Sequence, residues 1–528
     1  MLEAATFLCG AVVMALEMTG SRLLAPYLGS SVLVWTALIG VILAFLSGGY
    51  WLGGKLADRD PSRKKLSLII LAAAFCVLGT AVFHPGLLGA VSGLQAPPEY
   101  SAILAAALLF GPASLLLGMV SPYMVRVALQ SRRVPVEESG AVIGRFSAAG
   151  AIGSILGTFA GGYYLISWVG SRQSLYLLSS SLMIISLITL LSDRLTLRRG
   201  KILALLPLLG LGLCLYFVHS QRTLELAQEK QGNFSLDTRY NHLQIQEGLT
   251  AGGIRLRVLS TPPQLTQAAM DVNNPASLFL EYTKHYALAW QLRPQAKKLL
   301  MIGGAAYSVP KYLLRTRKEI QLDVVEIDPE MTALARSRFE LREDPRLRVF
   351  HEDARTFLNR YAASRAADYD IIMGDAFSSA YNIPFQLSTV ECAQRIHASL
   401  AADGIYIGNI LSAVTGEKSY LLRSFRASFE EVFPSVHVFP LRPEKADSVQ
   451  NVMLLALKNG YTLPRPQELE QAGMNRALLE FPQQAAEEFA VAHKMLRNEW
   501  RIILEEDLPP LRDDFAPVER YALPLIGE

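Results

Sequence analysis

The chain has 528 residues, of which 51% are hydrophobic and 18% charged, and its formal net charge at pH 7 is +3. This length predicts at least two domains, and the apolar content is too high for a wholly soluble protein. The small net charge argues against a nucleic-acid partner. The four cysteines show no CxxC or Cys/His spacing, so the sequence predicts neither a metal site nor a disulfide scaffold.

The first 220 residues are built from seven long apolar runs. Most of them approach the ~20 residues that a helix needs to cross a bilayer. Gly153, Gly157 and Gly161 repeat at four-residue spacing, which predicts close packing against another helix. We therefore predict a membrane module of about seven helices over residues 1–220, in contact with the lipid bilayer. The apolar runs cover residues 4–16, 33–51, 66–91, 102–125, 141–166, 175–191 and 202–218.

Basic residues are distributed unevenly among the loops of this module. They gather after the second, fourth and sixth runs, whereas Arg22 and Arg172 are the basic residues of the alternate loops. Cytoplasmic loops carry an excess of Lys and Arg, so the N-terminus is predicted to lie inside. The basic loops contain Lys55, Arg59, Arg63, Lys64, Lys65, Arg126, Arg132, Arg133, Arg194, Arg198, Arg199 and Lys201.

From about residue 220 the chain becomes more polar and its periodicity changes. Residues 240–247 and 253–260 alternate apolar and polar side chains, which predicts a β-hairpin. Strands at 299–302, 322–327, 347–350, 369–373 and 405–410 then alternate with helices, which predicts a parallel, doubly wound α/β sheet. We expect a hairpin subdomain with a connecting helix over 221–290, a Rossmann-like domain over 291–460 and a helical tail over 461–528.

Candidate ligand-binding residues follow the first two predicted strands of this sheet, because open α/β sheets bind ligands beyond the carboxyl ends of their strands. Gly303 and Gly304 follow the first strand, where glycine allows the backbone to approach a ligand closely. Glu326 follows the second strand, about 20 residues later, which is the spacing at which an acid meets the ribose hydroxyls of a bound nucleotide. A solvated carboxylate at the strand end is the alternative role for Glu326.

Carboxylates also follow the next two strands. Asp353 with Ala354 suits the exocyclic amine of an adenine ring, and an N-cap for the next helix is the competing role of Asp353. Asp375 stands where the reacting end of the ligand would lie, and the irregular segment 378–389 after it is long enough to form a lid. Together the four strand ends predict an adenosine-containing ligand. They favour a sulfonium cofactor over NAD, because two phosphates would require more glycine and some positive charge.

The order of these segments, "GG", "VEID", "DA" and "DAFS", resembles the spermidine synthases, which are polyamine aminopropyltransferases. The segments "ALEMTGSRLLAPYLGSSVLVW", "GGKLADR", "GSILGTFAGGYYLI" and "DDFAPVE" are similar to the membrane-fused branch of that family. The resemblance implies a Rossmann-like domain of the class I methyltransferase type, preceded by a small β-hairpin subdomain and a membrane module. It also suggests a homodimer.

The same resemblance assigns roles to individual positions. It implies that Asp375 accepts a proton from an attacking amine. The other implied contacts are with thioadenosine at Asn241, with ribose at Glu326, with adenine at Asp353 and Ala354, and with the polyamine channel at Tyr282 and His285.

Two positions depart from the family pattern. Ala306 replaces the aspartate that holds the cationic aminopropyl end of the co-substrate, and Ser378 replaces a second acid after the catalytic one. Losing one charge-assisted hydrogen bond costs about 1.5–3 kcal/mol, or roughly one to two decades in affinity. The missing acid at Ala306 therefore argues against decarboxylated S-adenosylmethionine and putrescine as the substrate pair, without excluding them.

The leading hypothesis is an aminopropyltransferase that uses decarboxylated S-adenosylmethionine on putrescine or a related amine, without a metal. One alternative is an S-adenosylmethionine-dependent methyltransferase, and another is a membrane transporter whose domain senses a nucleoside or polyamine without catalysis. The retained Asp375 argues against the sensor. The sequence does not decide on which side of the membrane the catalytic domain lies. An inside N-terminus and seven spans place it outside, whereas S-adenosylmethionine is cytosolic. A re-entrant first run would reduce the number of spans and, with the N-terminus still inside, place the domain inside.

Overall fold

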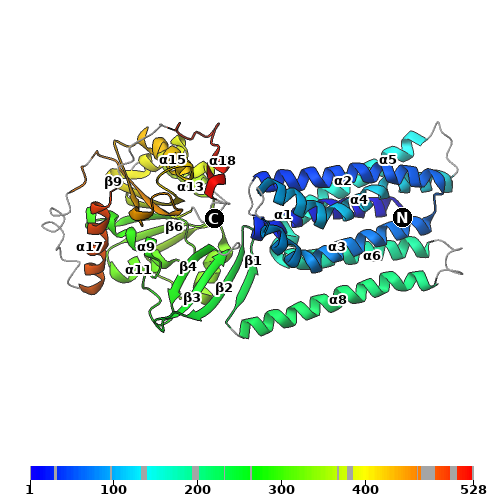
Figure 1. The fold of residues 1–528 in the computed structure, drawn as a ribbon, viewed down its shortest axis with the longest axis horizontal. Coiled ribbons are helices and arrows are strands. Elements are labelled where there is room, and N and C mark those ends of the chain that lie inside the picture. The colour runs from blue at the N-terminus through cyan, green and yellow to red at the C-terminus, as the bar shows by residue number, and fades with distance from the viewer. Residues whose placement is uncertain are drawn as a thin grey trace. The chain divides into compact units, whose positions relative to one another are not determined.

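The computed structural model describes residues 2–28, 32–94, 98–132, 139–192, 201–230, 232–261, 265–364, 368–376, 384–460, 462–464, 482–499 and 508–525. Within it the chain forms two compact units. The first comprises Met1–Gln244 with Thr261–Pro263 and is called the membrane unit after the spans that the sequence predicts. The second comprises Ile245–Ser260 with Gln264–Glu528 and is called the catalytic unit after the site that the sequence predicts. Each unit is described by itself below, and Figure 1 labels their elements.

The membrane unit contains long helices that run side by side (Figure 1). Seven helices in the described part of the chain are long and apolar enough to cross a membrane. The first of them does not end with the apolar run 4–16 but continues through Glu17 and Arg22 to Leu28, so it is long enough to span by itself. The helices are α1 (Leu2–Leu28), α2 (Val32–Arg59), α3 (Arg63–Ser92), α4 (Pro98–Arg132), α5 (Ser139–Phe159) with the π-helix η2 (Ala160–Val169), α6 (Ser171–Leu191) and α8 (Lys201–Lys230).

Glycines allow two pairs of these helices to pack at backbone contact. On α5, a Cβ atom at Gly153 would lie 1.9 Å from the Phe7 carbonyl oxygen of α1, and one at Gly157 would lie 2.2 Å from that of Ala11. On α2, a Cβ atom at Gly49 would lie 2.2 Å from the Leu115 carbonyl oxygen of α4. The predicted role of the four-residue glycine repeat in helix packing is therefore confirmed for α5.

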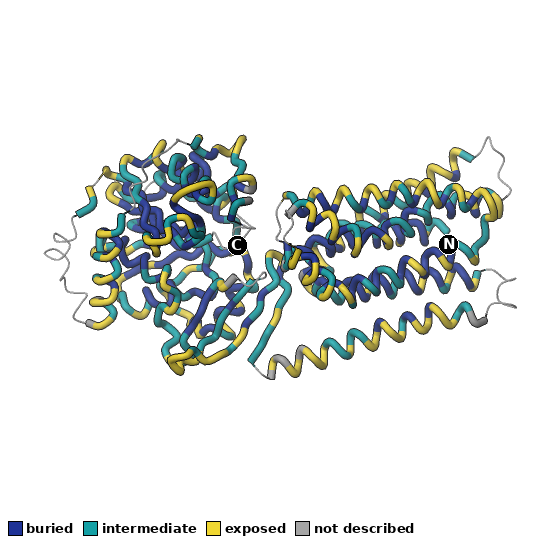
Figure 2. Tube along the Cα trace, in the orientation of Figure 1, coloured by how far each residue is buried: buried dark blue, intermediate teal, exposed yellow. Residues whose placement is uncertain are grey.

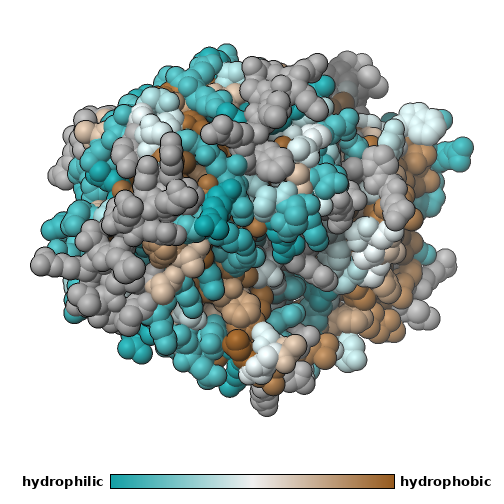
Figure 3. All heavy atoms as spheres, turned by 60° about the vertical axis from the view of Figure 1, so that its left-hand side comes forward, coloured by the Kyte–Doolittle hydropathy of each residue, from teal (hydrophilic) through white to brown (hydrophobic). Residues whose placement is uncertain are grey.

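The exposed surface differs between the two units. Large apolar side chains are exposed along the membrane helices, among them Leu43, Trp51, Ile155 and Leu205, and the outward faces of these helices are the exposed ones in Figure 2. Among the coloured residues of the face in Figure 3, hydrophilic side chains predominate and hydrophobic ones form smaller patches. An apolar exposed surface is what a helix in contact with lipid requires.

A four-stranded sheet, in the order β1-β2-β3-β4, follows α8. The predicted hairpin is confirmed as β2 and β3, and two further strands flank it. The last membrane helix ends at Lys230, somewhat beyond the predicted domain boundary at residue 220. The strands are β1 (Phe234–Asp237), β2 (His242–Leu249), β3 (Arg255–Thr261) and β4 (Leu265–Asp271).

The main sheet has seven strands in the order β10-β11-β9-β8-β5-β6-β7. Strands β5 to β9 pair in parallel, whereas β11 pairs antiparallel with both β9 and β10. This arrangement is the class I methyltransferase type of the Rossmann-like fold, as predicted, although β10 and β11 were not predicted. The strands are β5 (Lys298–Ile302), β6 (Gln321–Val325), β7 (Leu347–Phe350), β8 (Tyr369–Gly374), β9 (Leu400–Ser412), β10 (Ser435–Pro440) and β11 (Gln450–Leu457).

Helices cover both faces of this sheet (Figure 1). Alternate strand residues such as Met301 and Leu300 therefore enter two separate hydrophobic cores, and burial on both faces explains why these strands read as continuous apolar runs. The helices are α9 (Glu281–His285), α10 (Ala287–Leu292), α11 (Ser308–Thr316), α12 (Pro329–Arg338), α13 (Ala354–Ser364), α14 (Val390–Ser399), α15 (Tyr420–Glu430), α17 (Pro482–Arg497) and α18 (Val518–Ala522), with short 3-10 turns at Phe385–Leu387, Glu417–Ser419, Pro443–Lys445 and Leu523–Leu525.

Candidate active site

The turn between β5 and α11 lies at the centre of the sheet, where the strand order reverses. Gly303 has φ +90°, and a Cβ atom there would lie 2.6 Å from the carbonyl oxygen of Asp375. Only glycine fits both the backbone conformation and the close approach of the β8 end. Ala305 and Tyr307 also adopt left-handed backbone conformations, at φ 45° and 55°, which are uncommon for residues with a side chain.

Glu326 holds this turn in place from the end of β6. Its Oε2 atom accepts hydrogen bonds from the Gly304 N–H at 2.8 Å and from the Ala305 N–H at 3.3 Å. Its Oε1 atom accepts from the Asp328 N–H at 3.0 Å. Glu326 is only 8% exposed, so it is not a solvated strand-end carboxylate. The predicted glycine turn and the predicted acid therefore meet.

Tyr307 completes the turn and was not predicted as a site residue. Its hydroxyl hydrogen-bonds Thr332 at 2.7 Å, and its ring packs so close to Gly304 that a Cβ atom there would lie 2.8 Å from it. The signal in the sequence was the bulky tyrosine directly after "GGAA", where the resembling family carries a glycine.

Asp375 lies at the end of β8 and accepts two side-chain hydrogen bonds. The Tyr282 hydroxyl donates to Oδ2 at 3.1 Å, and the Asn409 Nδ2 atom donates to Oδ1 at 3.2 Å. Asn409 is oriented in turn by the Asn451 Nδ2 atom, which donates to its Oδ1 atom at 3.1 Å. Tyr286, the next tyrosine along the chain, donates to the Gly374 carbonyl at 2.7 Å. Tyr282, which the resemblance assigns to the polyamine channel, thus contacts the predicted catalytic acid directly.

Burial dominates the electrostatics of this carboxyl group. It raises the pKa of Asp375 to about 6, while the hydrogen bonds from Asn409 and Tyr282 act in the opposite direction. Burial together with the Asp375 charge raises the pKa of Tyr282 well above its usual value, so this tyrosine stays a hydrogen-bond donor. The site therefore contains an acid that titrates close to neutral pH beside a permanent donor.

Asp353 caps helix α13, as the competing prediction had it. Its Oδ1 atom accepts from the Thr356 N–H at 3.0 Å and its Oδ2 atom from the Gln386 Nε2 atom at 3.3 Å. Ala354 begins α13 and is 9% exposed. The adjacent Arg355 donates to Asp513 of the segment "DDFAPVE" at 2.6 Å, which ties the C-terminal segment to this edge of the sheet.

Three predicted site residues make no side-chain hydrogen bond to Glu326, Asp353 or Asp375 within the described part of the chain. His285 is buried, and its Nδ1 atom lies 3.0 Å from the Glu281 carbonyl oxygen of its own helix. Ala306 is 1% exposed, so its methyl group is packed inside the turn. Asn241 belongs to the membrane unit, where its backbone N–H donates to the Thr238 hydroxyl at 2.9 Å. Ser378 and the first part of the predicted lid lie outside the described residues.

The geometry thus places the glycine turn, Glu326, Asp353 and Asp375 at strand ends of a methyltransferase-type sheet, with Asp375 as the acid whose pKa is raised by burial. The described residues contain no cluster of three or more His, Cys, Asp or Glu side chains that could hold a metal ion. Two polar side chains of the site, Asn409 and Asn451, were not predicted. Their signal was an amide within each of two otherwise apolar strands: Asn409 in "IYIGNILS", and Asn451 next to Gln450 in "QNVMLLAL".

Comparison with known proteins agrees with this architecture. Residues 281–446 match the spermine/spermidine synthase domain. The chain is 29% identical over 191 residues to a polyamine aminopropyltransferase of Vibrio vulnificus. This match covers 36% of this chain and 62% of the relative. It is 25% identical over 205 residues to the eEF1A lysine and N-terminal methyltransferase of Mus musculus, covering 38% of this chain and 28% of the relative.

The solved structures include a probable spermidine synthase from Corynebacterium glutamicum. It has a TM-score of 0.39 at 22% identity and covers 45% of this chain and 85% of its own. For the two sequence relatives named above, the match covers less than two thirds of the relative's own length.

Proposed function

We propose that the protein is a membrane-bound aminopropyltransferase that moves the aminopropyl group of decarboxylated S-adenosylmethionine to putrescine or a related amine. The observation that carries this proposal is Asp375, a carboxyl group held by Tyr282 and Asn409 at the end of β8. The spermine/spermidine synthase domain over residues 281–446 supports the same reaction.

Asp375 would act on the attacking amine. The neutral amine nitrogen attacks the carbon bound to the sulfonium sulfur, a C–N bond forms, and the C–S bond breaks with its electron pair moving to sulfur. The products are neutral methylthioadenosine and an alkylated ammonium. Asp375 hydrogen-bonds the nitrogen as positive charge develops on it and accepts the proton that is released. A pKa of about 6 lies far below that of an alkylammonium near ~10, so its role is largely electrostatic and positional.

The co-substrate would bind along the strand ends. Glu326 already accepts hydrogen bonds from Gly304, Ala305 and Asp328. A carboxylate offers about four acceptor positions, so one remains for a ribose hydroxyl. Asp353 and Ala354 stand at the next strand end for the adenine. The protein then supplies mainly alignment of the amine with the sulfonium carbon.

Methyl transfer from S-adenosylmethionine is the second candidate, and Ala306 favours it. Ala306 is 1% exposed and offers no charge to an aminopropyl ammonium, and one relative is a methyltransferase. Both reactions attack a carbon bound to a sulfonium sulfur, so the rest of the site suits either one.

Calorimetry on the detergent-solubilised chain tests the choice of co-substrate. Methylthioadenosine, S-adenosylmethionine and decarboxylated S-adenosylmethionine are titrated in parallel into the wild type and into Glu326→Gln. Tightest binding of the decarboxylated form, weakened in Glu326→Gln, is the expected result. Tighter binding of the intact cofactor would favour the methyltransferase, and no binding of any of the three would contradict both enzymatic functions.

A further inference from the structure

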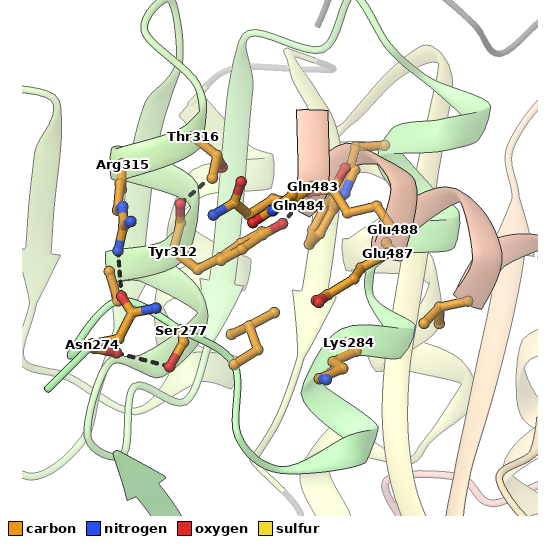
Figure 4. Close-up of a pocket in the computed structure, with 15 residues that line it drawn as sticks. Asn274, Ser277, Lys284, Tyr312, Arg315, Thr316, Gln483, Gln484, Glu487 and Glu488 are labelled. Atoms are coloured by element: carbon orange, nitrogen blue, oxygen red, sulfur yellow. Dashed lines mark hydrogen bonds between the residues drawn. The ribbon is translucent and has the colours of Figure 1, made fainter. Parts of the chain in front are cut away.

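A cavity away from the candidate active site lies in the catalytic unit and is lined by none of the predicted site residues. Its volume is about 270 Å³, slightly below the range typical of drug-sized ligands. Figure 4 shows that helices α9, α11 and α17 contribute side chains to it, together with the loop before α9. The lining residues used below are Asn274, Ser277, Leu278, Lys284, Ala287, Trp290, Tyr312, Arg315, Thr316, Gln483, Gln484, Glu487, Glu488 and Val491.

Two opposite charges in this cavity are unpaired among the described residues. Lys284 enters it from α9 and Glu487 from α17, and both are drawn in Figure 4. Neither has a hydrogen-bond or ion-pair partner within the described part of the chain, and no ion pair joins the two. Glu487 is exposed and Lys284 is half-buried, so both charged groups are open to solvent and accessible to a ligand.

The other charged groups in the cavity already have partners. Glu488 accepts from the Tyr312 hydroxyl at 2.6 Å and from the Arg317 Nη2 atom at 2.8 Å. Arg315 donates to the Asn274 Oδ1 atom. The Ser277 and Thr316 hydroxyls donate to backbone carbonyls, each at 2.8 Å. The cavity thus presents one available ammonium and one available carboxylate, with the amides of Gln483 and Gln484 beside them.

Apolar side chains form the rest of the wall. Leu278, Ala287 and Val491 line it together with the ring of Trp290, over which the Arg317 guanidinium lies at 5.3 Å from the ring centroid. A ligand that fits the cavity therefore needs two opposite charges and a short apolar part.

We propose that this cavity binds a small zwitterion of the free α-amino acid class, with its carboxylate at Lys284 and its ammonium at Glu487. A diamine would bring a second positive charge to Lys284, and a dicarboxylate would bring a second negative charge to Glu487. Both would be disfavoured by like-charge repulsion. The short helix α9 also carries Tyr282, the donor to Asp375, so an occupant that links α9 to α17 restrains an element of the active site.

Binding is measured by calorimetry on the full-length chain in detergent, with L-leucine, putrescine and succinate as probes. L-Leucine is expected to bind, and Lys284→Ala and Glu487→Gln are each expected to weaken it at least about tenfold. The matched controls are Lys297→Ala and Glu319→Gln, an exposed ion pair outside the cavity at 3.2 Å, and they are expected to leave the affinity unchanged.

Charge reversal separates recognition from a structural role. Glu487→Lys places two cations in the cavity, so the preference is expected to change from L-leucine to succinate, which mere destabilisation of α17 could not produce. The proposal is overturned if the wild type binds no L-leucine, if the affinity survives both single substitutions, or if Glu487→Lys still prefers L-leucine. Because these probes do not involve the adenosyl co-substrate, the result is independent of whether aminopropyl transfer occurs.

Discussion

Asp375 gives the reaction a defined pH dependence. Burial raises its pKa to about 6, so below that pH the group is neutral and no longer stabilises the positive charge that develops on the attacking amine. We therefore expect kcat to rise with pH through about 6 and then to level off. Asp375→Asn is expected to lower kcat by about 10²–10⁴, as for loss of a general base, and to remove this limb. A wild-type profile that is flat across this range would contradict the assignment.

Tyr282 lowers the pKa of Asp375. Its hydroxyl donates to the Asp375 Oδ2 atom at 3.1 Å, and a hydrogen bond to the ionised form lowers the pKa of a carboxyl group. Tyr282→Phe removes the donor, so the pKa of Asp375 rises and the acid limb of the kcat profile moves to higher pH. The same measurement on Tyr361→Phe, a tyrosine outside the site, is expected to leave the limb in place. A limb that moves to lower pH in Tyr282→Phe would refute this role.

Part of the site could be predicted at the scale of single residues and part could not. Gly303, Glu326 and Asp375 follow apolar strands directly, so their positions at one edge of the sheet follow from local sequence. Asn409 reaches Asp375, and Asn451 reaches Asn409, only because β9 lies between β8 and β11 in the sheet. Such a contact is tertiary, so the local sequence shows an amide in an apolar strand but not the partner that it contacts.

At the scale of elements, glycines determine the packing of α1 against α5. A Cβ atom at Gly157 would lie 2.2 Å from the Ala11 carbonyl oxygen, whereas one at Gly144 of the same helix would have nothing within 4 Å. Gly157→Leu is therefore expected to destabilise the membrane unit by about 1–3 kcal/mol, the usual cost of overpacking. Gly144→Leu is the matched control. Thermal unfolding in detergent measures both, and equal midpoints for the two variants would contradict the packing argument.

The parallel part of the sheet was predictable and its antiparallel edge was not. Strands β5 to β8 alternate with helices, and this alternation identifies them. β11 reads "QNVMLLAL", a short apolar run that periodicity alone cannot assign to a strand or a helix. The extension of α1 beyond its apolar run was also missed, because Glu17 is charged, yet it is buried within the helix bundle.

At the scale of the whole molecule, the number of spanning helices determines on which side of the membrane the catalytic unit lies. An odd number of spans places the chain after α8 on the face opposite the basic loops. If all seven helices span, the catalytic unit lies on the outer face; a cytosolic supply of S-adenosylmethionine instead requires that one of the seven does not span. Alkaline phosphatase and a fluorescent protein, each fused after the last residue, report opposite sides. Phosphatase activity without fluorescence is the expected outcome, and fluorescence alone would require one of the seven helices not to span.

The central claim is that the site transfers an aminopropyl group to an amine, and the most direct measurement is product analysis by mass spectrometry. The full-length chain in detergent is incubated with decarboxylated S-adenosylmethionine and putrescine, alongside Asp375→Asn and the exposed control Asp447→Asn. Aminopropylated amine and methylthioadenosine in equal amounts, lost in Asp375→Asn and retained in Asp447→Asn, is the predicted result. Methylated amine formed from S-adenosylmethionine, with no aminopropylated product, would contradict the account.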